Sequence, residues 1–338
     1  MSIEHLKTGD LVPKPPEPKS EAEIIAGWKG DWDKPVVSIC CITFNHQSYI
    51  EDAIRGFLSQ VTDFPFEILI NDDASADQTP KIIKSYADRY PKIIKPIIQD
   101  ENQFSKRVSP NISFNFPRAK GEFIALCEGD DFWLSTDKIR KQVSVLRNHP
   151  DSVLCFHDAR KIDESGLYID DMIPCNQRYL TRTELAKAPF SPTLTRMFRN
   201  VGFPWGNERD LPTAMDVCLA AYLSKFGGAV YLGNEVLSAY RVHCGGVWSL
   251  KNQCQKTRMT VDSRLYMAAH FRLERDEPDA EDAFDYHMAL AVKTILDQLK
   301  LSIAIKSVCR YFSFRGYAGL RGVSVRVARS LITIIRSR

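Results

Sequence analysis

The sequence of 338 residues lacks the cysteine and glycine patterns that mark several common protein classes. None of its nine cysteines forms a Cys-x-x-Cys pair, and several lie inside apolar runs, which is typical of free thiols. We therefore expect no disulfide framework, and this usage favours a reducing compartment. Neither a P-loop pattern (GxxxxGK followed by Ser or Thr) nor a GxGxxG dinucleotide fingerprint occurs.

Long apolar segments are also missing. The N-terminal stretch MSIEHLKTGDLVPKPPEPK contains no apolar core of the kind found in signal peptides. No uninterrupted apolar run approaches the roughly 18 residues that a membrane-spanning helix needs. With 44% hydrophobic and 26% charged residues, the composition is that of a soluble globular protein. We therefore expect a cytoplasmic protein.

Acidic residues are absent from the C-terminal segment 306–338, which contains eight Lys or Arg. Within it, residues 323–338 place apolar side chains roughly on one helical face and arginines elsewhere. This pattern indicates a basic amphipathic helix. Such a helix either lies on an anionic membrane surface or packs on the protein with its arginines in water. Aromatic residues are not interleaved with the basic ones in a recognisable module, so no nucleic-acid partner is expected.

The order of patterns along the chain predicts three regions. Residues 1–34 are predicted to form a polar, proline-rich arm followed by a short helix, and we expect the arm to be mobile. Residues 35–250 begin with apolar runs that alternate with helical periodicity, which is typical of an α/β fold with a mostly parallel sheet and helices on both faces. Residues 251–338 are predicted to be a helical extension that ends in the basic tail. The first predicted strands are 36–44, 66–72, 93–99 and 122–128.

Polar residues gather where three of these strands end, at 43–46, 71–73 and 128–131. Ligands of open parallel sheets bind beyond the carboxyl ends of the strands. Carboxylates that converge there suit a hard divalent cation, and Mg²⁺ or Mn²⁺ at such sites usually carries substrate phosphates.

Each cluster also has a purely structural interpretation. The loop after Asp72 and Asp73 could use its carboxylates only for turns and helix caps. The segment from Glu128 to Asp131 could be a solvated loop. A single histidine such as His243 is more often structural than a ligand.

Four ordered segments, 37–60, 67–79, 119–133 and 216–249, resemble those of bacterial family 2 glycosyltransferases with the Rossmann-like GT-A fold. The resemblance covers about residues 36–250. It implies the inverting transfer of a sugar from a nucleotide-sugar, with UDP-sugar as the expected donor, to an acceptor hydroxyl. It further implies a role in building a cell-surface polysaccharide such as O-antigen or capsule, on an acceptor that can be lipid-linked.

The resemblance also assigns roles to residues. The nucleotide would be bound by Thr43, Asn45, Asp72 and Asp73, and by Arg241, which could equally pair with a carboxylate. Glu128 would touch either the ribose or the metal, and the Mn²⁺ or Mg²⁺ ligands would be Asp130, Asp131 and His243. Asp216 would be the catalytic base, although it could also cap the helix that follows it. Trp248 would stack on the acceptor sugar unless it packs in the interior.

Two other functions remain open on the sequence. A nucleotidyltransferase of related α/β architecture would use similar carboxylates but attack a nucleoside triphosphate. A non-catalytic carbohydrate-binding protein would bind sugar without turnover. If the basic tail touches lipid, the protein would sit peripherally at the inner face of the cell membrane.

Overall fold

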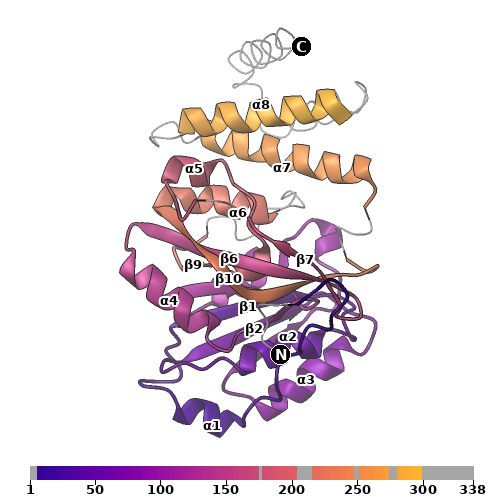
Figure 1. The fold of residues 1–338 in the computed structure, drawn as a ribbon, viewed down its shortest axis with the longest axis vertical. Helices are drawn as coiled ribbons and strands as arrows, with labels where there is room; N and C mark the ends of the chain where they lie inside the picture. Colours follow the sequence, from indigo (N-terminus) through magenta and orange to yellow (C-terminus); the bar gives the residue numbers. More distant parts are fainter. Residues whose placement is uncertain (1–5, 175–176, 204–214, 247–250, 274–279, 299–338) are drawn as a thin grey trace. The chain divides into compact units, whose positions relative to one another are not determined.

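The computed structural model describes residues 6–174, 177–203, 215–246, 251–273 and 280–298, and its fold is drawn in Figure 1. The chain divides into two compact units. The first comprises residues 1–180, 190–211 and 226–246, and the second comprises residues 181–189, 212–225 and 247–338. The sequence predicts a boundary at residue 250, and the segments 181–189 and 212–225, which precede it, belong by their contacts to the second unit.

One sheet of ten strands forms the centre of the first unit. Its order is β3-β2-β1-β4-β9-β6-β10-β5, with β7 paired to β6 and β8 paired to β10. The first four strands are parallel to one another, as predicted: β1 (Val37–Thr43), β2 (Phe66–Asp72), β3 (Ile94–Ile98) and β4 (Phe123–Leu126). Strand β3 ends the row, which suits Pro96 because proline cannot donate a ladder hydrogen bond.

The other half of the sheet is mixed. It contains β5 (Phe132–Trp133), β6 (Ser152–Asp163), β7 (Tyr168–Met172), β8 (Tyr179–Leu180), β9 (Met197–Arg199) and β10 (Gly228–Val242). Strand β9 runs antiparallel to both β4 and β6, and β10 runs parallel to β6. Ala239 of β10 pairs with Phe132 of β5. This pairing brings the end of β10 beside the acidic segment that follows β4.

Helices of the first unit are α1 (Glu21–Ala26), α2 (Ile50–Leu58), α3 (Thr79–Arg89) and α4 (Lys138–Asn148). Helix α2 buries the apolar stripe that its periodicity predicts, since Ile50, Ile54 and Phe57 are fully buried. Pro80 stands in the first turn of α3, where its missing N–H costs nothing. Short turns of helix include η2 (Phe104–Lys106), η3 (Asn111–Asn115), η4 (Phe116–Arg118) and η5 (Thr193–Thr195).

The N-terminal arm is packed against the first unit, although its composition predicts a mobile segment. We call residues 6–19 the N-terminal strap. Val12 is only 1% exposed and packs with Phe132 and Ile162. Leu11 forms an antiparallel bridge with Leu167, next to β7. Apolar contacts and backbone pairing therefore order a segment that is polar overall.

The second unit is helical. It contains α5 (Arg182–Ala186), α6 (Met215–Leu223), α7 (Gln253–Leu273) and α8 (Ala280–Gln298), with α7 and α8 side by side (Figure 1). The predicted C-terminal helical extension is thus confirmed. No helix among the described residues is both long and apolar enough to cross a membrane. The basic tail predicted at 323–338 lies outside the described residues.

Candidate active site

The acidic segment after β4 lies directly against the end of β1. The N–H of Gly129 donates a hydrogen bond to the carbonyl oxygen of Ile42 at 2.9 Å. A Cβ atom at Gly129 would lie 2.6 Å from Oγ1 of Thr43 and 2.9 Å from Cδ1 of Ile50. Only glycine allows this approach, so the spacing of Glu-Gly-Asp sets the position of Asp130.

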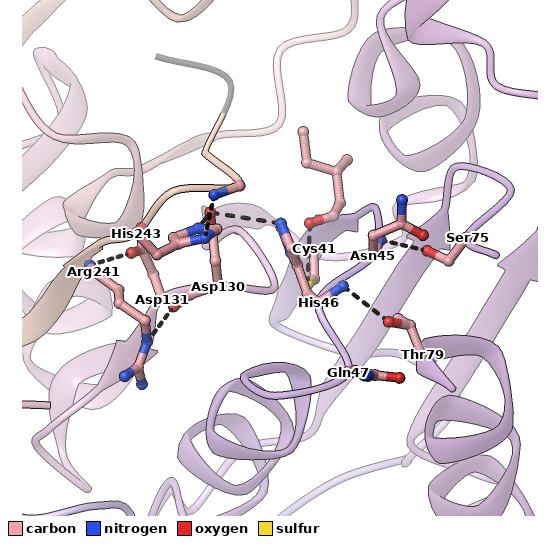
Figure 2. Close-up of polar contacts among 12 residues, drawn as sticks. Cys41, Asn45, His46, Gln47, Ser75, Thr79, Asp130, Asp131, Arg241 and His243 are labelled. Atoms are coloured by element: carbon pink, nitrogen blue, oxygen red, sulfur yellow. Dashed lines mark hydrogen bonds and ion pairs between the residues drawn. The ribbon is translucent and has the colours of Figure 1, made fainter. Parts of the chain in front are cut away.

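Asp130, His46 and His243 come from three different strand ends, and their side chains meet (Figure 2). Nε2 of His243, after β10, lies 3.0 Å from Oδ2 of Asp130. Nε2 of His46, after β1, lies 3.6 Å from the same oxygen. One ligand atom from each residue falls within 4.8 Å of the other two. Two imidazoles and a carboxylate at this spacing can hold a divalent cation on one face.

The charge states in this cluster suit a cation. Burial lowers the pKa of His46, so its imidazole is neutral at pH 7 and can donate a lone pair. Burial raises the pKa of Asp130, but the hydrogen bond from His243 and the nearby imidazoles outweigh this effect, so the pKa lies below its usual value. The carboxylate is therefore ionised. The donor set fits the divalent metal that the sequence predicts.

Asp131 does not share the cluster. Its Oδ1 accepts the backbone N–H of Arg241 at 2.7 Å, and the side chain is buried. Burial raises the pKa of Asp131 well above its ordinary value, and the charges of Asp130 and Glu128 raise it further. Of the three predicted metal ligands, the structure brings Asp130 and His243 together, and His46 is the third member of the cluster.

Arg241 pairs with a carboxylate, which is one of the two alternatives predicted for it. Its Nη2 lies 2.9 Å from Oδ2 of Asp52. Its Nε donates to the carbonyl oxygen of Asp130 at 3.0 Å, and its Nη1 donates to that of Glu164 at 3.3 Å. The guanidinium also lies 4.8 Å from the ring centre of Tyr49. Arg241 therefore holds the backbone of the acidic segment.

The residues predicted to bind the base and ribose make local contacts. Asn45 has a φ of 56°, a conformation that asparagine tolerates, and its Oδ1 accepts the N–H of Ala76 at 2.8 Å. Asp72 accepts the N–H of Ser75 at 3.0 Å. The turn alternative predicted for this carboxylate is therefore present in the structure.

Asp73 caps the segment that contains η2. Its two carboxylate oxygens accept the N–H groups of Gln103 at 2.7 Å and Phe104 at 3.0 Å. Burial raises the pKa of Asp73, although these two hydrogen bonds act in the opposite direction. The side chain thus connects the end of β2 to the loop before β4, and both oxygens are engaged.

The remaining predicted residues are Glu128, Asp216 and Trp248. Glu128 is half-buried beside the cluster. Asp216 is the second residue of α6, in the second unit, and its side chain lies outside the described set. Trp248 also lies outside the described residues.

His46 is the functional candidate that sequence reasoning missed. It lies three residues after Thr43, inside a polar cluster already predicted to line the pocket. Its N–H donates to Oγ1 of Thr79 at 2.9 Å, which fixes the backbone at the strand end. The available signal was a histidine directly after a parallel strand, but its partners in the cluster, Asp130 and His243, lie more than 80 positions further along the chain.

Comparisons with known proteins place this geometry in context. Residues 38–203 match the family described as Glycosyl transferase family 2. The uncharacterized protein Rv1520 of Mycobacterium tuberculosis is 36% identical over 216 residues, which are 63% of this chain and 60% of that protein. The match therefore spans less than two thirds of this relative.

Two other similarities are informative. The Escherichia coli protein named UDP-Glc:alpha-D-GlcNAc-diphosphoundecaprenol beta-1,3-glucosyltransferase WfaP is 26% identical over 252 residues, covering 70% of this chain and 90% of WfaP. The crystal structure of Staphylococcus aureus TarS 1–349 superposes with a TM-score of 0.58 at 16% identity, covering 81% of this chain and 80% of that one. The structural similarity shows the fold, and the predicted GT-A fold is confirmed.

Proposed function

Because residues 38–203 belong to glycosyl transferase family 2, we propose that this protein transfers a sugar from a nucleotide-sugar to an acceptor hydroxyl. The observation that carries the proposal is the cluster of His46, Asp130 and His243 at the strand ends of the sheet. A nucleotide-sugar presents a diphosphate, and a site for a hard cation at this edge is where a diphosphate would be held.

Asp130, His243 and His46 would hold the metal, and we propose Mn²⁺ in preference to Mg²⁺. Two imidazole nitrogens favour a transition metal, whereas Mg²⁺ prefers oxygen ligands and retains water. A bound divalent cation would neutralise the charge that develops on the departing diphosphate. The buried carboxylate of Asp131 would act differently, by holding the backbone of Arg241 beside the ligand segment.

Thr43 and the loops around it would bind the nucleotide. Oγ1 of Thr43 is buried without a hydrogen-bond partner among the described residues, and a buried hydroxyl left in this state is costly. Asn45 and Asp73 shape the same strand ends through the contacts to Ala76, Gln103 and Phe104. Their role in this proposal is to keep the loops of the pocket in place, with Glu128 near the ribose.

Asp216 is proposed as the base that takes the proton of the acceptor hydroxyl. A carboxylate opposite the leaving group suits a single in-line displacement, which inverts the sugar carbon. Its place in the first turn of α6 keeps its backbone fixed on a helix. Trp248 is proposed to stack on the acceptor sugar.

The acceptor is proposed to be a saccharide on a lipid diphosphate in cell-surface polysaccharide synthesis. The name of WfaP, which resembles this chain over most of its length, specifies a UDP-sugar donor and a lipid-linked acceptor. Contact of the basic tail with anionic lipid would keep the enzyme at the inner membrane face.

Product analysis tests the proposal. The protein is incubated with UDP-sugars or with UTP, each in the presence of Mn²⁺, Mg²⁺ or EDTA. We expect UDP release from a UDP-sugar that requires metal, stops with EDTA and is nearly abolished in Asp130→Asn. Asp63→Asn is the matched control and should retain activity, because Asp63 is an exposed carboxylate that pairs with Lys29. Pyrophosphate release from UTP, or sugar binding without any turnover, would overturn the assignment.

A further inference from the structure

Arg241 is the residue through which the strand ends of the site are joined. Its guanidinium reaches Asp52 and the carbonyl oxygens of Asp130 and Glu164, and its N–H reaches Asp131. The side chain is 2% exposed. His243, two residues further along the chain, completes the cluster with Asp130. The position of Arg241 therefore determines how close these two ligands come.

The N-terminal strap contacts three of the groups that hold Arg241. Nζ of Lys14 lies 3.0 Å from Oδ2 of Asp52, the same oxygen that Arg241 uses. Val12 packs on Phe132, whose ring centre lies 5.4 Å from the guanidinium of Arg241. The third contact joins backbone groups of the strap to the turn that carries Glu164.

This third contact supports the turn that carries Glu164. The N–H of Gly9 donates to the carbonyl oxygen of Tyr168, and the N–H of Val12 donates to that of Gly166, both at 2.9 Å. Tyr168 in turn donates its N–H to the carbonyl oxygen of Asp10 at 2.8 Å. The strap thus pairs with the loop whose Glu164 carbonyl accepts from Arg241.

We propose that the N-terminal strap is a positioning element of the active site. It fixes Arg241 from three sides, and Arg241 fixes Asp130 beside His243 at a separation that binds metal. The strap precedes residue 38, where the family match begins. This inference rests on the proposed function, because it assigns a role at the same site.

Lys14→Met and Val12→Ala test the strap at two independent contacts. Each should weaken Mn²⁺ binding to the protein alone by about tenfold or more, because groups that orient metal ligands change affinity on this scale. In Lys14→Met the direction of the change in Mn²⁺ affinity is informative. Removing a positive charge would by itself tighten cation binding, so weaker binding requires displaced ligands. Lys14→Arg should restore most of the affinity.

Matched controls separate positioning from general loss of stability. Lys29→Met breaks a similar pair at 3.1 Å, with Asp63, away from the site. Ile24→Ala removes a buried apolar side chain from α1. Both should leave the Mn²⁺ dissociation constant within about twofold of wild type, measured by isothermal titration calorimetry, even where Ile24→Ala lowers the melting temperature.

Hydrogen exchange gives a second measurement that needs no metal. The N–H of Arg241 is protected by Asp131, so its exchange should accelerate in Lys14→Met and Val12→Ala relative to both controls. Unchanged exchange together with unchanged Mn²⁺ affinity would overturn the positioning role while leaving the proposed function intact. Absence of Mn²⁺ binding in the wild type would instead contradict the proposed metal site, and with it this inference.

Discussion

Nε2 of His243 lies 3.0 Å from Oδ2 of Asp130, although the two residues are 113 positions apart in the chain. The contact forms because β10 pairs with β5, and β5 follows the acidic segment directly. His46 approaches the same oxygen from the end of β1. A divalent cation would be bound where three strand ends meet, and the following predictions test the elements that create this geometry.

Replacing either histidine of the cluster should weaken metal binding. We expect His46→Ala and His243→Ala each to raise the Mn²⁺ dissociation constant by about tenfold or more, since even residues outside the ligand shell have effects of that size. Calorimetric titration or the electron paramagnetic resonance signal of free Mn²⁺ would measure it. His149→Ala is the control, because the His149 imidazole lies against the carbonyl oxygen of Val145 and the hydroxyl of Tyr179 and is not a member of the cluster. Unchanged affinity in His46→Ala would remove that residue from the site.

A methyl group at Gly129 should displace the acidic segment. In Gly129→Ala the new Cβ would meet Thr43 and Ile50 at distances that real Cβ atoms do not adopt. We expect the free energy of unfolding to fall by about 1–3 kcal/mol and metal-dependent activity to be lost. Denaturant titration and the UDP-release assay measure the two effects. In Gly27→Ala the Cβ lies 3.4 Å from its nearest neighbour, so this control should change stability little.

Lys138 should make stability depend on pH. It is fully buried, donates to Oε1 of Gln142 at 2.6 Å and lies over the ring of Trp133 at 4.2 Å. Burial lowers the pKa of Lys138 to about 7, although the nearby thiols of Cys127 and Cys155 act in the opposite direction. In the unfolded chain the amine stays protonated to about pH 10. The unfolded state therefore binds more protons above pH 7, and stability rises with pH there.

Comparison of Lys138→Met with wild type isolates this contribution. From pH 7 to 8.5, the unfolding free energy of wild type should rise relative to that of Lys138→Met, by up to about 1.4 kcal/mol per pH unit. Lys84→Met, at an exposed position on α3, should follow the wild-type curve. Parallel curves for wild type and Lys138→Met in urea titrations would contradict a neutral buried amine.

Asp73 should be important for stability because both of its oxygens accept backbone N–H groups. We expect Asp73→Ala to lower the free energy of unfolding by about 1–3 kcal/mol, since two partly buried N–H groups lose a charged acceptor. Asp88→Ala, at an exposed position on α3, should cost less than about 0.5 kcal/mol. If Asp73→Ala instead weakened UDP binding without any loss of stability, the carboxylate would contact the nucleotide directly.

Much of the fold follows from local pattern. Continuous apolar runs predict β1, β2 and β4, because parallel strands are buried on both faces. The spacing of Ile50, Ile54 and Phe57 predicts the buried face of α2. The composition of the N-terminal strap predicts a mobile segment, and this prediction is wrong. Val12 packs on residues that lie 120 or more positions away, and composition cannot reveal such contacts.

The sequence by itself determined which strand ends carry polar residues, and so that Asp130 belongs to the site. Those features are local: a buried run, a glycine and the carboxylates that follow. Only the tertiary structure decided that His46 joins Asp130 and His243 and that Asp131 accepts the N–H of Arg241. The reason is that side-chain partners at a sheet edge depend on strand order and register, and these depend on long-range packing that no short segment encodes.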